Sequence, residues 1–149
     1  MSEKNARIFQ RAHRVRFSEC DPAGIVFYPQ YFVMLNDLLE AWIDDILNVG
    51  FAGYILDKRW GLPSVRLEAD FKAISRMGDD IVLTLKVEHV GRRSLILHLD
   101  CTGVSGDLRM RMVQTMVSTD LDTHRAIDIP TPLREALGWL PEDLPAVSE

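Results

Sequence analysis

One stretch of the chain, residues 29–48, repeats its hydrophobic and polar positions at the spacing of an α-helix. Apolar side chains recur at steps of three and four residues, and acidic and amide side chains recur at the same steps on the other side. Pro29 suits the first turn of a helix, and Gly50 suits a position just beyond the last turn. The pattern predicts one long helix, and its apolar side is wide enough for a curved sheet to wrap around it.

Alternation of apolar and polar positions predicts β-strands in most of the remaining chain. The clear runs lie at residues 65–72, 81–88, 95–101 and 108–112, and a weaker run lies at residues 9–17. After the last clear run the alternation slips at Val113, which predicts a β-bulge there. Short turns join the later strands, so we expect antiparallel neighbours. A short helix is expected to start near Thr131 and to end at Gly138.

The order of these segments predicts an α+β fold in which an antiparallel sheet wraps around one long central helix. The length of 149 residues fits a single domain, 1–149, with its core at about residues 8–130 and a short C-terminal extension containing Pro141 and Pro145. A net charge of -5 gives no general attraction to nucleic acid or to anionic membranes. No apolar run approaches the roughly 20 residues that cross a bilayer, and the two cysteines fit a reducing interior. We therefore expect a cytoplasmic protein with no nucleic-acid or membrane partner.

The first candidate for chemistry is Asp21, which lies in a loop before the predicted helix. A helix start offers unpaired N–H groups and the positive end of the helix dipole, and both stabilise a developing oxyanion. A carboxylate beside it has the chemistry of a nucleophile or a general base. The alternative is that Asp21 and Pro22 merely begin a turn, and the residues on their own favour this alternative.

Cys20 and the histidines are weaker candidates. On an alternating strand the odd separation between His13 and Cys20 puts the two side chains on opposite faces, so Cys20 is expected to be an inert thiol rather than a nucleophile. The four histidines have no metal-binding spacing and no nearby cysteine pair. We expect neither a metal ion nor a cofactor.

Arg92, Arg93 and Ser94 lie at a hairpin between two predicted strands. Two adjacent guanidinium groups and a hydroxyl have the chemistry of a phosphate clamp. Arginines are also common in solvated turns, so these residues on their own leave both interpretations open.

The run FSECDPAGIVFYPQY, from Phe17 to Tyr31, resembles the signature of the 4-hydroxybenzoyl-CoA thioesterase family of hot-dog-fold proteins. The resemblance extends over roughly residues 10–130, because the order of the strands fits as well. It implies that Asp21 is the catalytic carboxylate and that the backbone N–H of Tyr28 polarises the thioester carbonyl. It also implies that chains pair into dimers, commonly doubled to tetramers, with active sites between the chains.

The same resemblance assigns residues that bind the substrate. Arg92, Arg93 and Ser94 match a basic stretch that contacts the phosphates of coenzyme A. Asn36 stands where related proteins have a carboxylate that receives a substrate phenol, and Leu62 stands where they have a threonine. A phenol hydroxyl left without its partner costs about 1–3 kcal/mol, so these two departures bear on the acyl group that the protein accepts.

The sequence thus predicts a cytoplasmic acyl-CoA thioesterase that hydrolyses an aromatic or compact acyl group, such as 4-hydroxybenzoyl, to the free acid and coenzyme A. A hydratase with the same fold would need a histidine at the site, and residues 29–48 contain none. The other alternative is a non-catalytic acyl-CoA-binding or assembly module. The presence of Asp21 favours the enzyme.

Overall fold

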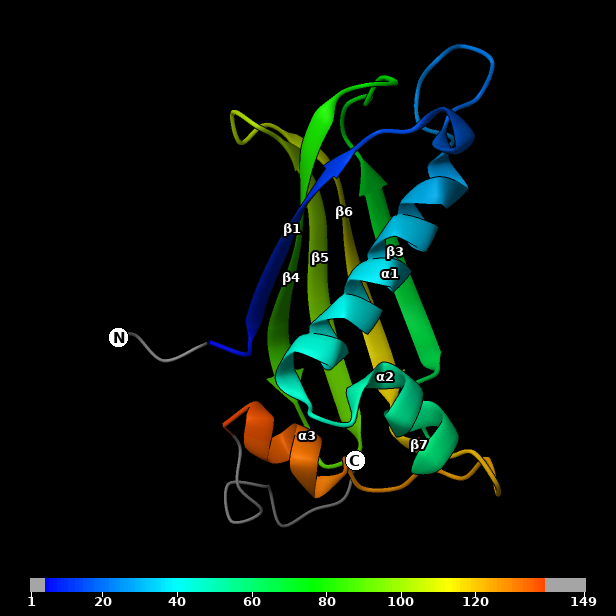
Figure 1. Ribbon diagram of the computed structural model, residues 1–149, viewed down its shortest axis with the longest axis vertical. Helices are drawn as coiled ribbons and strands as arrows, with labels where there is room; N and C mark the ends of the chain where they lie inside the picture. Colours follow the sequence, from blue (N-terminus) through cyan, green and yellow to red (C-terminus); the bar gives the residue numbers. More distant parts are fainter. Residues whose placement is uncertain (1–4, 139–149) are drawn as a thin grey trace.

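A computed structural model describes residues 5–138 of the chain (Figure 1). The end of the predicted C-terminal extension, residues 139–149, lies outside the described residues. Five strands form one antiparallel sheet in the order β1-β4-β5-β6-β3. Their bounds are β1 (Ile8–Arg14), β3 (Ser64–Phe71), β4 (Asp80–Val90), β5 (Ser94–Gly103) and β6 (Leu108–Val117). Two short strands, β2 (Trp60–Gly61) and β7 (Thr119–Asp120), pair separately, which the sequence pattern did not predict.

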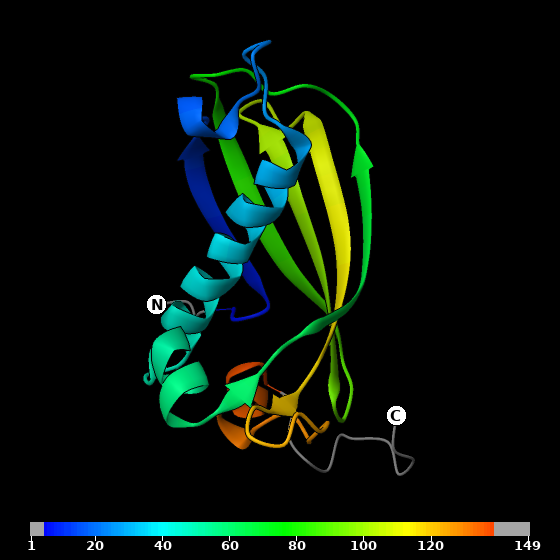
Figure 2. The same cartoon turned by 90° about the vertical axis from the view of Figure 1, so that its right-hand side faces the viewer.

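The long helix α1 (Tyr28–Ile46) crosses one face of the sheet, which curves around it (Figures 1 and 2). Trp42 on the helix and Leu85 and Leu97 on the central strands are completely buried. The three residues belong to one buried cluster, and burying a large apolar side chain contributes about 1.5–3 kcal/mol, so the core between helix and sheet stabilises the fold. The predicted α+β fold, with a sheet wrapped around one long helix, is confirmed.

The chain after α1 differs from the prediction. α1 ends at Ile46, two residues early, and Gly50 opens a short second helix, α2 (Gly50–Ala52), instead of only terminating the first. A π-helical turn, η2 (Gly53–Asp57), follows it. The last helix, α3 (Thr131–Ala136), lies where the sequence predicted it. Within residues 5–138, no helix combines the length and the apolar character needed to span a membrane.

Strand β6 corrects one prediction, because no β-bulge occurs at Val113. That residue pairs in register with both neighbouring strands. The inward-facing positions continue without interruption through Met110, Met112, Gln114 and Met116. The alternation seemed to slip because Gln114 places a polar side chain at an inward position, where an apolar one was expected.

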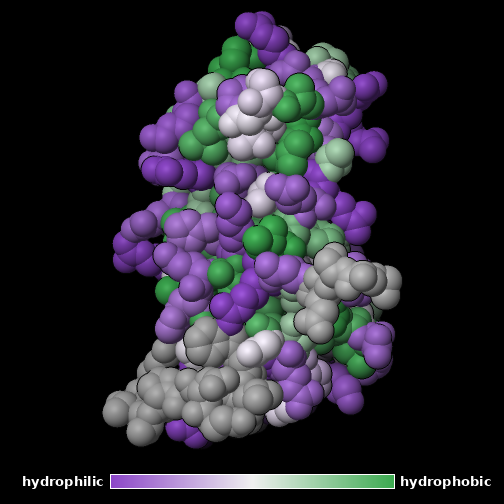
Figure 3. Space-filling model, turned by 90° about the vertical axis from the view of Figure 1, so that its left-hand side faces the viewer, coloured by the Kyte–Doolittle hydropathy of each residue, from purple (hydrophilic) through white to green (hydrophobic). Residues whose placement is uncertain are grey.

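The two edge strands of the sheet present different surfaces. β1 exposes Gln10, Arg11 and Arg14, and the side of the molecule that carries β1 is largely hydrophilic (Figure 3). β3 exposes three large apolar side chains between charged ones, Val65, Leu67 and Phe71, at 62%, 49% and 49%, whereas the large apolar side chain exposed on β1 is Ile8, at 47%. An open strand edge with exposed apolar side chains is a surface that proteins usually cover.

Candidate functional site

Asp21 lies in a tight hairpin, residues 19–27, which we call the Asp21 turn. The Phe27 N–H donates to the Glu19 carbonyl at 2.9 Å and fixes the base of the hairpin. The Gly24 N–H donates to the Asp21 carbonyl at 2.9 Å and closes the tip. Gly24 has φ 78°, a left-handed conformation that suits glycine. The hairpin returns the chain directly from Asp21 to the start of α1.

The Asp21 carboxylate makes one hydrogen bond within the described part of the chain. Its Oδ1 accepts from the Ala23 N–H at 2.8 Å, which is the turn-forming role that the sequence left open. The side chain is half-buried. Because the turn uses Oδ1, Oδ2 remains for a ligand or a water molecule, so the turn-forming and catalytic interpretations of Asp21 are compatible.

The start of α1 supplies a backbone amide next to this hairpin. The helix begins at Tyr28, and among the described residues no hydrogen bond uses the Tyr28 N–H. Pro29 has no N–H, and the Gln30 N–H donates to the Phe27 carbonyl at 2.8 Å. The Tyr28 N–H is therefore available to an oxygen atom of a ligand, at the positive end of the helix dipole.

The loop between β3 and β4 holds the Asp21 turn in place. The Val26 N–H donates to the Ser75 carbonyl, and the Met77 N–H donates to the Gly24 carbonyl, both at 2.9 Å. Ser75 is buried, and its hydroxyl accepts from the Tyr31 hydroxyl at 2.9 Å. These bonds join the hairpin, the loop and the first turn of α1 into one unit, which fixes the carboxylate relative to the helix start.

Arg92, Arg93 and Ser94 lie in a second turn, residues 91–94, which we call the arginine turn. Both guanidinium groups contact Asp128, with Arg92 Nε 3.1 Å and Arg93 Nε 3.4 Å from Asp128 Oδ1. Burial acts to raise the pKa of Asp128, but hydrogen bonds from the two arginines outweigh burial and lower the pKa. The two arginine side chains remain 38% and 39% exposed, so an anion in solvent can reach them.

A buried arginine, Arg134 of α3, holds the backbone of the arginine turn. Arg134 is 3% exposed, and its Nη2 donates to the Gly91 carbonyl at 2.7 Å and to the Arg92 carbonyl at 2.9 Å. The Ile129 N–H also donates to the Arg92 carbonyl, at 2.9 Å. Hydrogen bonds from a charged donor are among the strongest in proteins. The turn is therefore fixed from inside while its own side chains stay at the surface.

The Asp21 turn and the arginine turn lie at opposite ends of one chain, at the top and bottom of Figure 1. β4 runs between them, since its first residue pairs with the end of β1 and its last residue precedes the arginine turn. β4 has 11 residues, so at about 3.3 Å per residue the strand between the two turns is about 35 Å long. The arm of coenzyme A between thioester and phosphates is too short to cover this distance. One ligand molecule does not reach both turns of the same chain.

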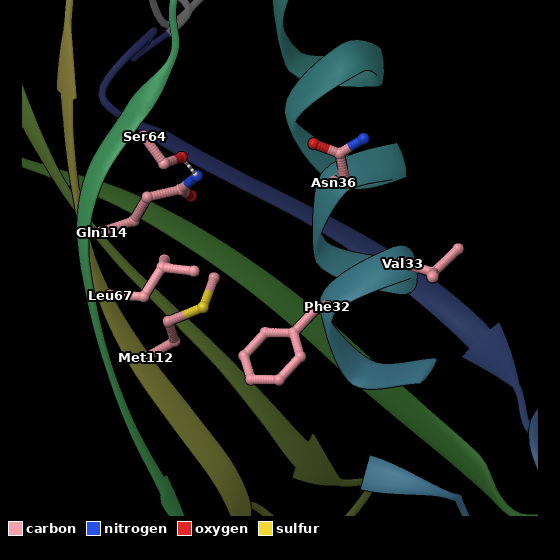
Figure 4. Close-up of a pocket in the computed structure, with 7 residues that line it drawn as sticks. All are labelled: Phe32, Val33, Asn36, Ser64, Leu67, Met112 and Gln114. Carbon is pink, nitrogen blue, oxygen red and sulfur yellow. Dashed lines mark hydrogen bonds between the residues drawn. The ribbon is translucent and has the colours of Figure 1, made fainter. Parts of the chain in front are cut away.

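Asn36 and Leu62 come together in one cavity, which we call the Leu62 cavity. It has a volume of about 500 Å³, and most of its other lining residues are apolar. Asn36 also lines a neighbouring cavity of about 340 Å³ between α1 and β3, which we call the Gln114 cavity (Figure 4). Its lining residues are Phe32, Val33, Asn36, Ser64, Leu67, Met112 and Gln114. The two residues inferred to contact the acyl group therefore border space large enough for one.

Three residues around these sites escaped the reasoning from sequence. Asp128 and Arg134 lie more than thirty positions from the arginine turn, and no local pattern connects them to it. Gln114 did leave a signal, because a polar residue interrupted an alternating apolar run, but we interpreted that interruption as a bulge.

Cys20 is not arranged as a nucleophile. Burial raises the pKa of its thiol, and the carboxylates of Glu19 and Asp21 raise it further, which disfavours the thiolate. His13 Nε2 lies 2.9 Å from Glu19 Oε1 instead. These contacts agree with the expected inert thiol. No cluster of three histidine, cysteine or acidic side chains able to hold a metal ion occurs in the part of the chain that the structure describes.

Comparison with known proteins gives a family and a set of related structures. The family model of the Thioesterase-like superfamily matches residues 15–137. The chain is 24% identical over 140 residues to the 4-hydroxybenzoyl-CoA thioesterase of Pseudomonas sp. strain CBS-3, covering 84% of this chain and 94% of that protein.

Solved structures are similar over nearly the whole described chain. A 1,4-dihydroxy-2-naphthoyl-CoA thioesterase from Synechocystis has a TM-score of 0.80 at 21% identity, covering 88% of this chain and 96% of that one. A mutant 4-hydroxybenzoyl-CoA thioesterase in complex with 4-hydroxybenzoyl-CoA has a TM-score of 0.78 at 25% identity, covering 88% and 99%. A thioesterase-superfamily protein from Jannaschia sp. has a TM-score of 0.80 at 24% identity, covering 98% and 99%. The predicted hot-dog fold is confirmed.

Proposed function

The chain belongs to the Thioesterase-like superfamily and is a thioester hydrolase, and on this premise we propose that it cleaves an aryl-CoA thioester with Asp21 as the catalytic carboxylate. The relatives named above act on 4-hydroxybenzoyl-CoA and on 1,4-dihydroxy-2-naphthoyl-CoA. The observation that carries the proposal is the Asp21 turn, which holds a carboxylate beside an unused amide at a helix start.

The chemistry follows from these two groups. The Tyr28 N–H donates to the thioester oxygen and stabilises the negative charge that develops there. In one route the Asp21 carboxylate takes a proton from water, and the resulting hydroxide adds to the carbonyl carbon. In the other route the carboxylate adds to that carbon itself, and water hydrolyses the resulting anhydride. In both routes the carbon–sulfur bond breaks, and coenzyme A leaves as a thiolate that is then protonated.

Coenzyme A is proposed to bind by its phosphates to Arg92, Arg93 and Ser94. The two guanidinium groups are partly exposed and next to each other, which suits a multiply charged phosphate group. Asp128 neutralises part of their charge in the free protein. The acyl group is proposed to lie near Asn36 and Leu62, where the chain provides two adjoining cavities.

A complete site on this proposal needs two copies of the chain, because β4 separates the Asp21 turn from the arginine turn. A second copy pairing at the edge strand β3 would cover Val65 and extend the sheet. Each site would then take Asp21 from one protomer and the arginine turn from its partner. Assembly of such dimers into a tetramer and a cytoplasmic location stay predictions.

Mixed dimers test this arrangement. At substrate concentrations well below KM, we expect Asp21→Asn and the double variant Arg92→Ala/Arg93→Ala each to hydrolyse acyl-CoA poorly, the first through kcat and the second through KM. A dimer with one chain of each kind contains one site with neither change, so each mixed dimer should have about half the wild-type turnover. Random pairing at equal amounts makes about half of the dimers mixed, so the refolded mixture should reach about a quarter of the wild-type value per dimer.

Asp21→Asn refolded with itself is the matched control and should stay inactive. Light scattering should show a dimer or a larger assembly at micromolar concentration. A monomeric active protein, or mixed dimers no more active than their parents, would contradict a site shared between two chains.

A further inference from the structure

Gln114 is an exception among the residues of β6 that face α1. Its neighbours along the inward face are Met112 and Met116, both of which are at most 4% exposed. Gln114 itself is 9% exposed, so most of its surface is buried. Burying an amide costs free energy unless hydrogen bonds compensate it, and an apolar residue at this position would avoid the cost. The position therefore calls for an explanation in terms of what the amide contacts.

One side of the amide has a fixed partner within the protein. Gln114 Nε2 donates to the Ser64 hydroxyl on the adjacent strand β3 at 2.6 Å, the contact drawn as a dashed line in Figure 4. This bond holds the side chain in one orientation. The carbonyl oxygen, Oε1, borders the Gln114 cavity and has no protein donor among the described residues. A hydrogen-bond acceptor is thus held in place at the edge of the Gln114 cavity.

The lining of the Gln114 cavity indicates the kind of group that this acceptor meets. The lining contains no ionisable side chain, so it does not compensate the charge of a carboxylate or an amine. Phe32, Leu67 and Met112 provide an apolar surface, and Asn36 lies across the cavity on α1 (Figure 4). A neutral ring that carries a hydroxyl group matches this combination, because the ring contacts the apolar side chains and the hydroxyl donates to an amide oxygen.

We infer that Gln114, held by Ser64, is a specificity-determining residue that accepts a hydrogen bond from a hydroxyl group on the acyl ring. This inference rests on the proposed function. It gives the hydroxyl of such a substrate a partner on β6, at a site that lacks the carboxylate and the threonine at positions 36 and 62.

The test compares two substrates, 4-hydroxybenzoyl-CoA and benzoyl-CoA, in the wild-type protein and in Gln114→Met. Methionine matches glutamine in length and matches its neighbours in polarity, so the variant keeps the packing and removes the acceptor. The ratio of kcat/KM for the hydroxylated to the unsubstituted thioester should fall at least about five-fold. Ser64→Ala, at an exposed position, removes the hydrogen bond that orients the Gln114 amide but keeps the amide itself. This variant should lower the ratio of the two kcat/KM values by less than Gln114→Met does.

Gln10→Met is the matched control. Gln10 lies on β1, at the opposite edge of the sheet from β3, and its Nε2 donates to the Thr84 hydroxyl at 3.2 Å. Gln10 lines neither cavity, so Gln10→Met should not change the ratio of the two kcat/KM values. Calorimetric binding of 4-hydroxybenzoate and benzoate provides a readout that needs no turnover.

The outcomes separate this inference from the proposed function. A wild-type protein that turns over neither thioester but binds 4-hydroxybenzoate better, with the preference lost in Gln114→Met, would contradict the function and support the role of Gln114. Turnover of both thioesters with an unchanged ratio in Gln114→Met and Ser64→Ala would overturn the role of Gln114 and leave the function standing.

Discussion

The two ends of β4 present charged side chains in opposite ways. At one end the Asp21 carboxylate accepts a single bond from a backbone amide of its own turn, and no cation contacts it among the described residues. At the other end Arg92 and Arg93 share the carboxylate of Asp128. Both turns are held by bonds to distant segments, the first by Ser75 and the second by Arg134. The protein thus fixes the backbone at both ends but neutralises charge at only one.

This difference suits the two proposed roles. A carboxylate that takes a proton or attacks a carbonyl loses reactivity when a cation holds its lone pairs. Arginines that bind phosphate exchange one anion for another when the ligand arrives. The Asp128 carboxylate therefore holds the two arginine side chains in place in the free protein without preventing phosphate binding. The difference also predicts that substitutions at one end change kcat and that substitutions at the other end change KM.

The largest effect is expected at the Asp21 end. Asp21→Asn keeps the bond to Ala23, because an asparagine oxygen accepts equally well in such a turn. It removes the negative charge, and we expect kcat to fall at least about 100-fold while acyl-CoA binding and folding stay nearly unchanged. Steady-state kinetics and calorimetric binding measure both quantities.

A second aspartate with the same geometry controls for the turn. Asp120 Oδ1 accepts from the Asp122 N–H at 2.7 Å, so Asp120→Asn makes the same change in a similar turn elsewhere. This variant should keep normal turnover. Normal turnover by Asp21→Asn would show that the residue only forms its turn.

A smaller and different effect is expected at the arginine end. Replacing Arg92 and Arg93 together with alanine should raise KM at least about ten-fold and change kcat little, because phosphate contacts are similar in the ground and transition states. The rise should shrink with added salt, which screens the wild-type attraction. Arg11→Ala/Arg14→Ala removes the same charge from exposed positions on β1 and should leave KM unchanged. If the two double variants have equal KM values at low salt, Arg92 and Arg93 do not bind the phosphates of the substrate and are only part of a solvated turn.

The smallest effect is expected for Asp128. Its pKa is lower in the folded protein than the ordinary value near 4, so its pairing with Arg92 and Arg93 stabilises the fold above about pH 4 and loses its effect as pH falls through the lowered pKa. Asp128→Asn should therefore decrease the free energy of unfolding at pH 7 by less than about 1 kcal/mol, since the pair is half exposed. At pH 3 the decrease should be smaller, which urea denaturation at both values checks.

Asp128→Asn should also change the binding of the substrate phosphates to Arg92 and Arg93. Without the Asp128 carboxylate a phosphate no longer competes for the arginines, so KM should fall by up to about five-fold at low salt while kcat stays the same. A rise in KM would mean that Asp128 positions the arginines for the ligand more than it competes with the ligand.

Much of this molecule was predictable from local patterns. The long helix, the five strands and the position of Asp21 before the helix start all depend on residues close together in the chain, whose spacing encodes the structure. Asp128 and Arg134 were not predictable, because only the folded sheet brings them to the arginine turn. Gln114 lay between these cases: its polarity was visible, but without the register of β6 it could not be distinguished from a bulge.

The order of strands in the sheet also bears on how the chain folds. β4, β5 and β6 follow one another along the chain and pair as neighbours, so their contacts close only short loops. Both edges need long-range closure, since Arg14 pairs with Asp80 and Phe71 pairs with Met110. The arginine turn connects two strands of this local meander, whereas the Asp21 turn rests on β1 and on the loop after β3. We therefore expect the β4–β5 hairpin that carries the arginine turn to form early in folding, before Asp128 and Arg134 reach it. The Asp21 carboxylate should reach its position only after both edge strands have docked.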